Sequence, residues 1–139
     1  LKQLLEIHEK TQSSVLGVFS ASENQVSNYG VISSKNIDGI EKVDSIVEKP
    51  KPADAPSNLA VFGRYILSKD IFLNIEKTKP GLNNEIQLTD AIQDLISNQD
   101  VFALEFEGRR FDCGSKEGYI AAIIDRASSI DKYKSIIEK

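Results

Sequence analysis

An acidic and a basic residue, Glu48 and Lys49, stand side by side between an apolar pair and Pro50. A carboxylate accepts hydrogen bonds from sugar hydroxyls, and an ammonium group binds phosphate. Neighbouring side chains of a regular strand point to opposite faces, so these two charges converge only where the chain bends. Pro50 and Pro52 supply a reason for a bend. The alternative is an exposed charge pair that closes a strand, and spacing alone favours it.

Two further stretches place polar or small residues where predicted elements meet. Gly30 follows Tyr29 at a turn-to-strand junction. The missing side chain lets a ligand approach the backbone, although turn geometry is the simpler explanation. Glu85 to Asp90 opens a helix, where polar side chains either cap the free amides or bind a ligand, and capping is the favoured interpretation.

Asp112 lies at the end of a short predicted strand, just before Gly114 and the start of a helix. Magnesium prefers oxygen ligands and keeps substrate phosphates and waters in its shell, so one carboxylate from this chain can suffice for a site. Capping of the helix that follows is the alternative role for Asp112. The sequence leaves both roles open.

The composition is that of one soluble globular domain, with 40% hydrophobic and 27% charged residues among 139. A net charge of −4 argues against nucleic-acid binding. No apolar run approaches the roughly 20 residues that span a membrane. Cys113 is the only cysteine, so no internal disulfide forms, which favours a cytoplasmic location. The chain begins at Leu1 within a helical pattern and has no methionine, which predicts a piece of a longer protein.

The hydrophobic periodicity predicts strands interleaved with helices. Helices are expected over residues 1–12, 87–98, 115–127 and 130–138, with short helical turns within 22–28 and after Ser68, whose hydroxyl would cap the latter. Strands are expected over 14–21, from 29 onward, and over 40–48, 59–67, 101–106 and 110–112, with loops at 50–58 and 78–84. The inner side of the helix over 115–127 would carry Tyr119, Ile120, Ile123 and Ile124.

Turn chemistry at residues 36–39 (NIDG) predicts an antiparallel hairpin. The fold class is therefore α/β, with a mixed sheet and flanking helices.

Taken in order, five strings resemble the C-terminal half of bacterial UTP–glucose-1-phosphate uridylyltransferases (UDP-glucose pyrophosphorylases), in the sugar nucleotidyltransferase family. The strings are NYGV at 28–31, IVEKP at 46–50, APSNLAVFGRYIL at 55–67, NEIQLTDAI at 84–92 and DCG at 112–114. The resemblance covers the chain from its first strand to about residue 127. It implies a single partial domain over 1–139, the C-terminal half of a Rossmann-like nucleotidyltransferase fold.

The resemblance also implies a reaction. UTP and glucose 1-phosphate would give UDP-glucose and pyrophosphate with Mg2+, through direct attack of the sugar phosphate on the α-phosphorus. By position, Glu48 would bind glucose hydroxyls, and Lys49 would bind the sugar phosphate as the catalytic residue. Asp112 matches a metal-coordinating aspartate. The other substrate-binding positions, by backbone contact or by shaping the sugar pocket, would be Gly30, Val61, Tyr29 and Tyr65.

The family's other half has no counterpart here, because the chain lacks its glycine-rich nucleotide loop, first metal aspartate and uracil pocket. We therefore expect this piece to be inactive alone, to need that N-terminal half as a partner, and to form a homo-oligomer. A severed half-sheet would also expose an edge and apolar surface. The alternatives are a thymidylyl- or adenylyltransferase, or a non-catalytic module that binds a sugar phosphate or a protein.

Overall fold

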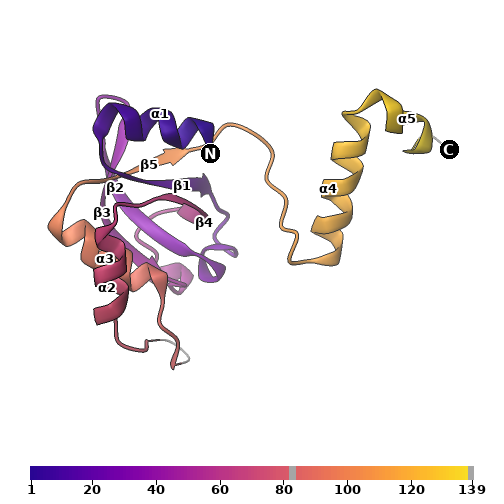
Figure 1. Ribbon diagram of the computed structural model, residues 1–139. Coiled ribbons are helices and arrows are strands. Elements are labelled where there is room, and N and C mark those ends of the chain that lie inside the picture. Colours follow the sequence, from indigo (N-terminus) through magenta and orange to yellow (C-terminus); the bar gives the residue numbers. More distant parts are fainter. Residues whose placement is uncertain (82–83, 138–139) are drawn as a thin grey trace. The chain divides into compact units, whose positions relative to one another are not determined.

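The structure is a computed structural model that describes residues 1–81 and 84–137, in two compact units divided after Phe106 (Figure 1). Each unit is described by itself. The organisation of residues 1–139 as a single partial domain stays a prediction.

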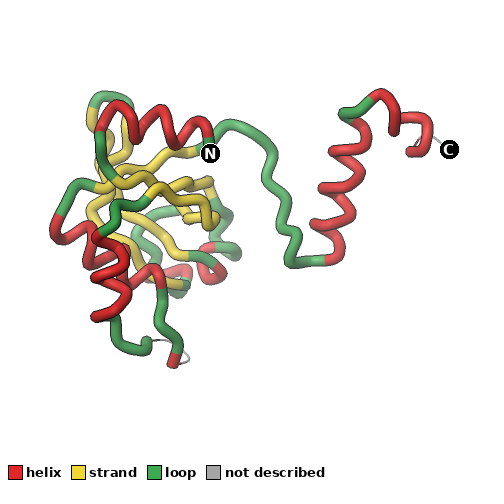
Figure 2. Tube along the Cα trace, viewed as in Figure 1, coloured by secondary structure: helices red, strands yellow, loops and turns green. Residues whose placement is uncertain are grey.

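The first unit combines helices and strands, as expected (Figure 2). Its described elements are α1 (Lys2–Thr11), β1 (Ser14–Ser20), η1 (Val26–Asn28), β2 (Gly30–Ile37), β3 (Ile40–Glu48), η2 (Pro52–Asp54), β4 (Leu59–Ile66), α2 (Asp70–Lys77), α3 (Leu88–Asn98) and β5 (Val101–Glu105). The second unit holds α4 (Lys116–Ser128) and α5 (Asp131–Ile137). The ends of most of these elements were predicted to within about two residues, but η2 lies in the segment 50–58 that was predicted as a loop, and no end was predicted for β2 or α2. Residue 138 and two positions of the 78–84 loop lie outside the described residues.

The sheet is mixed, which confirms the α/β class. Strand β1 runs parallel to β5 and antiparallel to β4, and β2 is antiparallel to both β3 and β4. Near the hairpin tip, Glu41 and Lys42 of β3 pair with β5. The pairings therefore close into the ring β1-β4-β2-β3-β5. Among the residues that the structure describes, the prediction of an exposed sheet edge is wrong, because β3 pairs with β5 near the hairpin tip and closes the ring.

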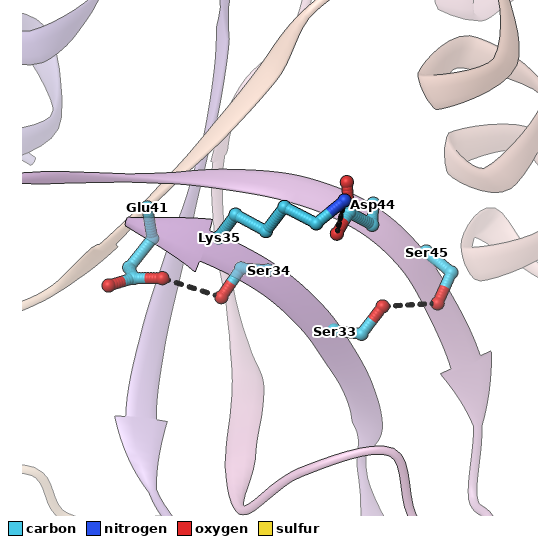
Figure 3. Close-up of polar contacts among 6 residues, drawn as sticks. All are labelled: Ser33, Ser34, Lys35, Glu41, Asp44 and Ser45. Carbon is cyan, nitrogen blue, oxygen red and sulfur yellow. Dashed lines mark hydrogen bonds and ion pairs between the residues drawn. The ribbon is translucent and has the colours of Figure 1, made fainter. Parts of the chain in front are cut away.

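The β2–β3 hairpin turns at Asp38 and Gly39, both with positive φ (52° and 83°). Two left-handed residues are what a tight two-residue hairpin turn requires, so the prediction from NIDG is confirmed. The polar side chains on this hairpin also meet across the strands (Figure 3). The contacts are Ser33–Ser45 (2.7 Å), Ser34–Glu41 (2.7 Å) and Lys35–Asp44 (3.3 Å).

The main core lies between the sheet and helices α2 and α3. Leu95 and Ile92 of α3 are 1% exposed, and they belong to one apolar cluster with Leu16 and Ile32 of the strands. Helix α3 therefore packs as its period predicts. Ser68 does not cap α2 with its side chain, in contrast to the prediction. Its hydroxyl instead accepts a hydrogen bond from the side-chain amide of Gln99, a residue between α3 and β5.

In the second unit, Ser115 caps α4, and its hydroxyl accepts a hydrogen bond from the Gly118 amide. The predicted strand at 110–112 is absent from the described residues, which form an irregular segment there. The apolar face of α4 is not an inner side, since its members are half exposed, namely Tyr119, Ile120, Ile123 and Ile124. Two short helices offer too little partner surface to bury it. No helix in the described part of the chain has the length and apolar character that a membrane crossing requires.

Candidate sugar-phosphate site

The end of β3 brings Glu48 and Lys49 together. Lys49 takes a left-handed backbone conformation (φ 44°), which turns its side chain back toward its neighbour. Its ammonium lies 3.6 Å from Glu48 Oε1. The two side chains therefore meet at a bend, which lies at Lys49 itself, just before Pro50. An ion pair at a strand end also fits the charge-pair alternative, and convergence on a ligand stays a prediction. A non-glycine residue with positive φ is uncommon, and such residues concentrate at functional sites.

The Glu48 carboxylate is largely buried, whereas the Lys49 ammonium is exposed to solvent. The Glu48 side chain is 17% exposed, against 42% for Lys49. The backbone N–H of Lys49 donates to the Tyr29 carbonyl at 3.0 Å, which ties the bend to the start of β2. The pair therefore sits on a fixed backbone, with the lysine facing solvent.

Gly30 lies directly opposite Glu48 in the β2–β3 ladder. A Cβ placed on Gly30 would lie 3.0 Å from Val61 Cγ2 and 3.4 Å from Glu48 Oε2. Gly30 has no positive φ, so the turn-geometry interpretation does not explain it. A side chain at this position would be tightly packed against Val61. The structure thus brings together Gly30, Val61 and Glu48, from three different strands.

Thr89, in the first turn of α3, completes this group. Its hydroxyl donates to Glu48 Oε2 at 2.5 Å, and the residue is 8% exposed. The stretch Glu85–Asp90 was predicted to cap the helix, and that is wrong for the side chains, because Gln87 is the N-cap and makes no side-chain cap bond. The sequence placed Thr89 at a helix mouth but gave no sign that it contacts Glu48.

The two tyrosines differ in their contacts. Burial raises the pKa of Tyr65, and the negative charge of Glu48 raises it further. Tyr65 therefore stays a neutral hydroxyl at neutral pH, and it packs against the main apolar core. The Tyr29 ring instead packs edge-to-face on Phe19, with centroids 5.2 Å apart. Tyr29 reaches the Glu48–Lys49 bend through its backbone carbonyl.

The resulting group has a clear chemistry. One oxygen of the Glu48 carboxylate accepts from a hydroxyl, and the other faces an ammonium. Such a carboxylate retains lone pairs that can accept from ligand hydroxyls. The adjacent exposed ammonium can bind a phosphate through a charge-assisted hydrogen bond. A polyol that carries a phosphate matches both groups at once.

Asp112 belongs to the second unit, where it is exposed in an irregular loop. Its Oδ1 accepts from the Gly114 amide at 3.0 Å, and Ser115 rather than Asp112 caps α4. The helix-cap alternative is therefore wrong for the Asp112 side chain. Among residues 1–81 and 84–137, no three histidine, cysteine, aspartate or glutamate side chains are grouped to hold a metal ion. A carboxylate oxygen is the kind of ligand that magnesium prefers, and the metal role of Asp112 stays a prediction.

Comparisons with known proteins extend over nearly the whole chain. UTP–glucose-1-phosphate uridylyltransferase 2 of Streptococcus pyogenes serotype M3 is 47% identical over 128 residues, which cover 91% of this chain and 43% of that protein. The chain thus spans less than half the length of the curated relatives it matches.

Solved structures agree with this likeness. A UDP-glucose pyrophosphorylase complexed with UDP-glucose is 44% identical, with a TM-score of 0.87 over 93% of this chain and 49% of that one. A UTP-bound enzyme of the same kind from Acinetobacter baumannii is 33% identical, with a TM-score of 0.81 over 98% and 47%. Residues 1–129 also match the family model described as nucleotidyl transferase. The chain therefore belongs to the nucleotidyl transferase family.

Proposed function

We propose that the protein containing this chain transfers a uridylyl group from UTP to glucose 1-phosphate, giving UDP-glucose and pyrophosphate. The observation that carries the proposal is the convergence of Glu48 and Lys49 beside the bare backbone of Gly30. This arrangement suits a hexose phosphate. The relatives named for this activity, at 47% identity, supply the nucleotide and the reaction class.

In the reaction, an oxygen of the sugar phosphate attacks the α-phosphorus of UTP. A new P–O bond forms there, the bond to the β-phosphate oxygen breaks, and pyrophosphate leaves. Lys49 binds the attacking phosphate and offsets its charge, so that it can approach the negatively charged triphosphate. Glu48 accepts hydrogen bonds from the glucose hydroxyls and fixes the direction of attack.

The remaining site residues have supporting roles in this proposal. Gly30 and Val61 present backbone to the hexose, and Gly30 leaves room because it has no side chain. Tyr65 would shape the sugar pocket, and Tyr29 holds the bend through its carbonyl. Asp112 would supply one carboxylate oxygen to Mg2+, which neutralises phosphate charge when it is bound.

This chain supplies the sugar-phosphate half of the site, as the C-terminal half of the catalytic domain. The nucleotide-binding half lies outside it, so the chain alone is inactive. The whole protein acts as a homo-oligomer in the cytoplasm.

The test uses the full-length protein that the gene encodes. Its release of pyrophosphate is measured with glucose 1-phosphate and each of UTP, dTTP and ATP. We expect UTP to be preferred by at least tenfold, and the 139-residue chain to release none. A preference for dTTP or ATP would assign the protein to a thymidylyl- or adenylyltransferase. Absence of release with every nucleotide would favour a non-catalytic sugar-phosphate module.

A further inference from the structure

The Thr89 side chain is a buried polar group of α3 that no step of the proposed reaction uses. Its hydroxyl has one hydrogen, which it donates to Glu48 Oε2 at 2.5 Å. A hydrogen bond to a charged acceptor is among the stronger ones in proteins. The contact joins residues 41 positions apart, so it connects the helix to the end of β3.

A second contact between α3 and β3 occurs one helical turn later. Gln93 Oε1 accepts from the backbone N–H of Ile46 at 2.8 Å. Thr89 and Gln93 are four residues apart, a rise of about 6 Å in a helix, and their two partners in β3 are two residues apart, about 6.6 Å in a strand. The spacings match, so the helix side chains hold β3 at two points in register.

This pairing constrains the Glu48 carboxylate. Oε2 is held by Thr89 while Oε1 faces the Lys49 ammonium, so the two carboxylate oxygens are distinguished. The site of a Cβ on Gly30 is 3.4 Å from both Glu48 Oε2 and Thr89 Oγ1. Gly30 therefore lies directly beside the Thr89–Glu48 hydrogen bond. Rotation of the carboxylate would break the Thr89 hydrogen bond.

We infer that Thr89 is a positioning residue for sugar-phosphate binding. It holds the Glu48 carboxylate so that its remaining lone pairs face the hexose hydroxyls, and it acts through Glu48 rather than by touching the substrate. Binding groups whose geometry is fixed before the ligand arrives lose less entropy on binding. This inference rests on the proposed function.

The experiment compares Thr89→Val with Thr89→Ser in the full-length protein, assayed by pyrophosphate release. Valine keeps the shape and removes the donor, so the KM for glucose 1-phosphate should rise about tenfold or more while the KM for UTP changes less than twofold. Serine keeps the hydroxyl and should stay within about threefold of the parent. Thr89→Ala replaces Thr89→Val if the valine variant does not fold, as judged by circular dichroism.

Thr78→Val is the matched control, because the Thr78 hydroxyl also donates a short hydrogen bond, to the Asn74 carbonyl of α2. It should leave both KM values unchanged. The inference is overturned if the parent is active and Thr89→Val keeps its KM for glucose 1-phosphate, or if serine fails to rescue. A parent without activity would instead reject the proposed function.

Discussion

At the scale of single residues, the site depends on a backbone conformation as much as on charge. The ion pair of Glu48 and Lys49 is partly exposed, and such pairs contribute only about 0–1 kcal/mol to stability. Stability alone therefore does not account for a lysine in the left-handed region. A ligand that uses both charges would account for it, because the turned backbone accompanies an arrangement in which the two charged groups lie 3.6 Å apart.

Lys49→Ala tests this interpretation in the full-length protein. Turnover should fall by about 10²–10³-fold, as happens when one donor to a developing charge is removed. The free energy of unfolding should change by less than about 1 kcal/mol, since the pair is partly exposed. Lys35→Ala is the control, because it also loses an exposed ion pair, with Asp44 at 3.3 Å. Equal kinetics in Lys49→Ala and the parent would remove Lys49 from the mechanism.

Asp112→Asn tests the metal role in the same protein. The amide keeps an oxygen that can accept from Gly114 but loses the negative charge that Mg2+ prefers. The Mg2+ concentration for half-maximal activity should therefore rise about tenfold, measured by titration at saturating substrates. Asp131→Asn, another exposed carboxylate of the second unit, should leave it unchanged. An unaltered titration for Asp112→Asn would leave this side chain with only its turn contact.

Tyr65 makes stability depend on alkaline pH. Burial and the Glu48 charge raise its pKa above the ordinary value of 10.0, so the folded state holds this proton more tightly than the unfolded state. Its contribution is complete below pH 10 and is lost as pH rises through the raised pKa. Tyr65→Phe should therefore flatten the loss of stability above pH 10 in urea titrations. An equally steep loss in the variant would assign the alkaline sensitivity to another group.

At the scale of elements, local patterns predicted what local chemistry determines. The spacing of apolar residues predicted α3, and the turn residues Asp38-Gly39 predicted the hairpin, because both signals lie within a few residues of the chain. The hydrogen bond between Thr89 and Glu48 had no such signal, since it depends on how α3 packs on β3. The prolines predicted a bend, but only the structure shows that Lys49 supplies it.

The local range of sequence patterns also explains the predictions that were wrong. The Ser68 hydroxyl was assigned to its own helix, while the fold brings Gln99 within reach of it. Ring closure of the sheet depends on pairing between β3 and β5, segments some sixty positions apart in the chain. The family resemblance supplied part of this long-range information, because it assigned roles to Glu48, Gly30 and Val61, which the structure brings together.

Helix α3 holds the site through its apolar face, which Leu95→Ala tests. Leu95 is 1% exposed in the main core, so truncation should lower the free energy of unfolding by about 2–5 kcal/mol. The KM for glucose 1-phosphate should rise as well, because α3 carries Thr89. Leu73→Ala is the control, on an exposed position of α2, and should change stability by less than about 1 kcal/mol. Chemical denaturation of both variants measures the difference.

At the scale of the whole molecule, the first unit has a closed strand ring and a buried core, and the second unit leaves its apolar side chains open. The exposed groups on α4 and α5 include Ile123, Ile124, Tyr133 and Ile136, which line a shared apolar depression with Ala127. Within the described residues the strands close into a ring, so the expected exposed edge is wrong. Exposed large apolar side chains lie on both units, including Phe72 and Leu73 of α2, and several of those on the second unit line one shared depression.

We therefore expect the 139-residue chain to self-associate through α4 and α5, because apolar surface removed from water stabilises association by about 25 cal/mol per Å2. Light scattering over a range of concentrations should give a mass above the 15.4 kDa of one chain. Ile123→Glu should return the mass to that of one chain, because an unpaired carboxylate would have to be buried in the contact. Ala121→Glu adds the same charge to an exposed position away from the Ile123 side of α4 and should leave the association intact. A parent chain that stays at 15.4 kDa at every concentration would contradict the expected self-association. Two variants that dissociate alike would place the contact elsewhere than on the Ile123 side of α4.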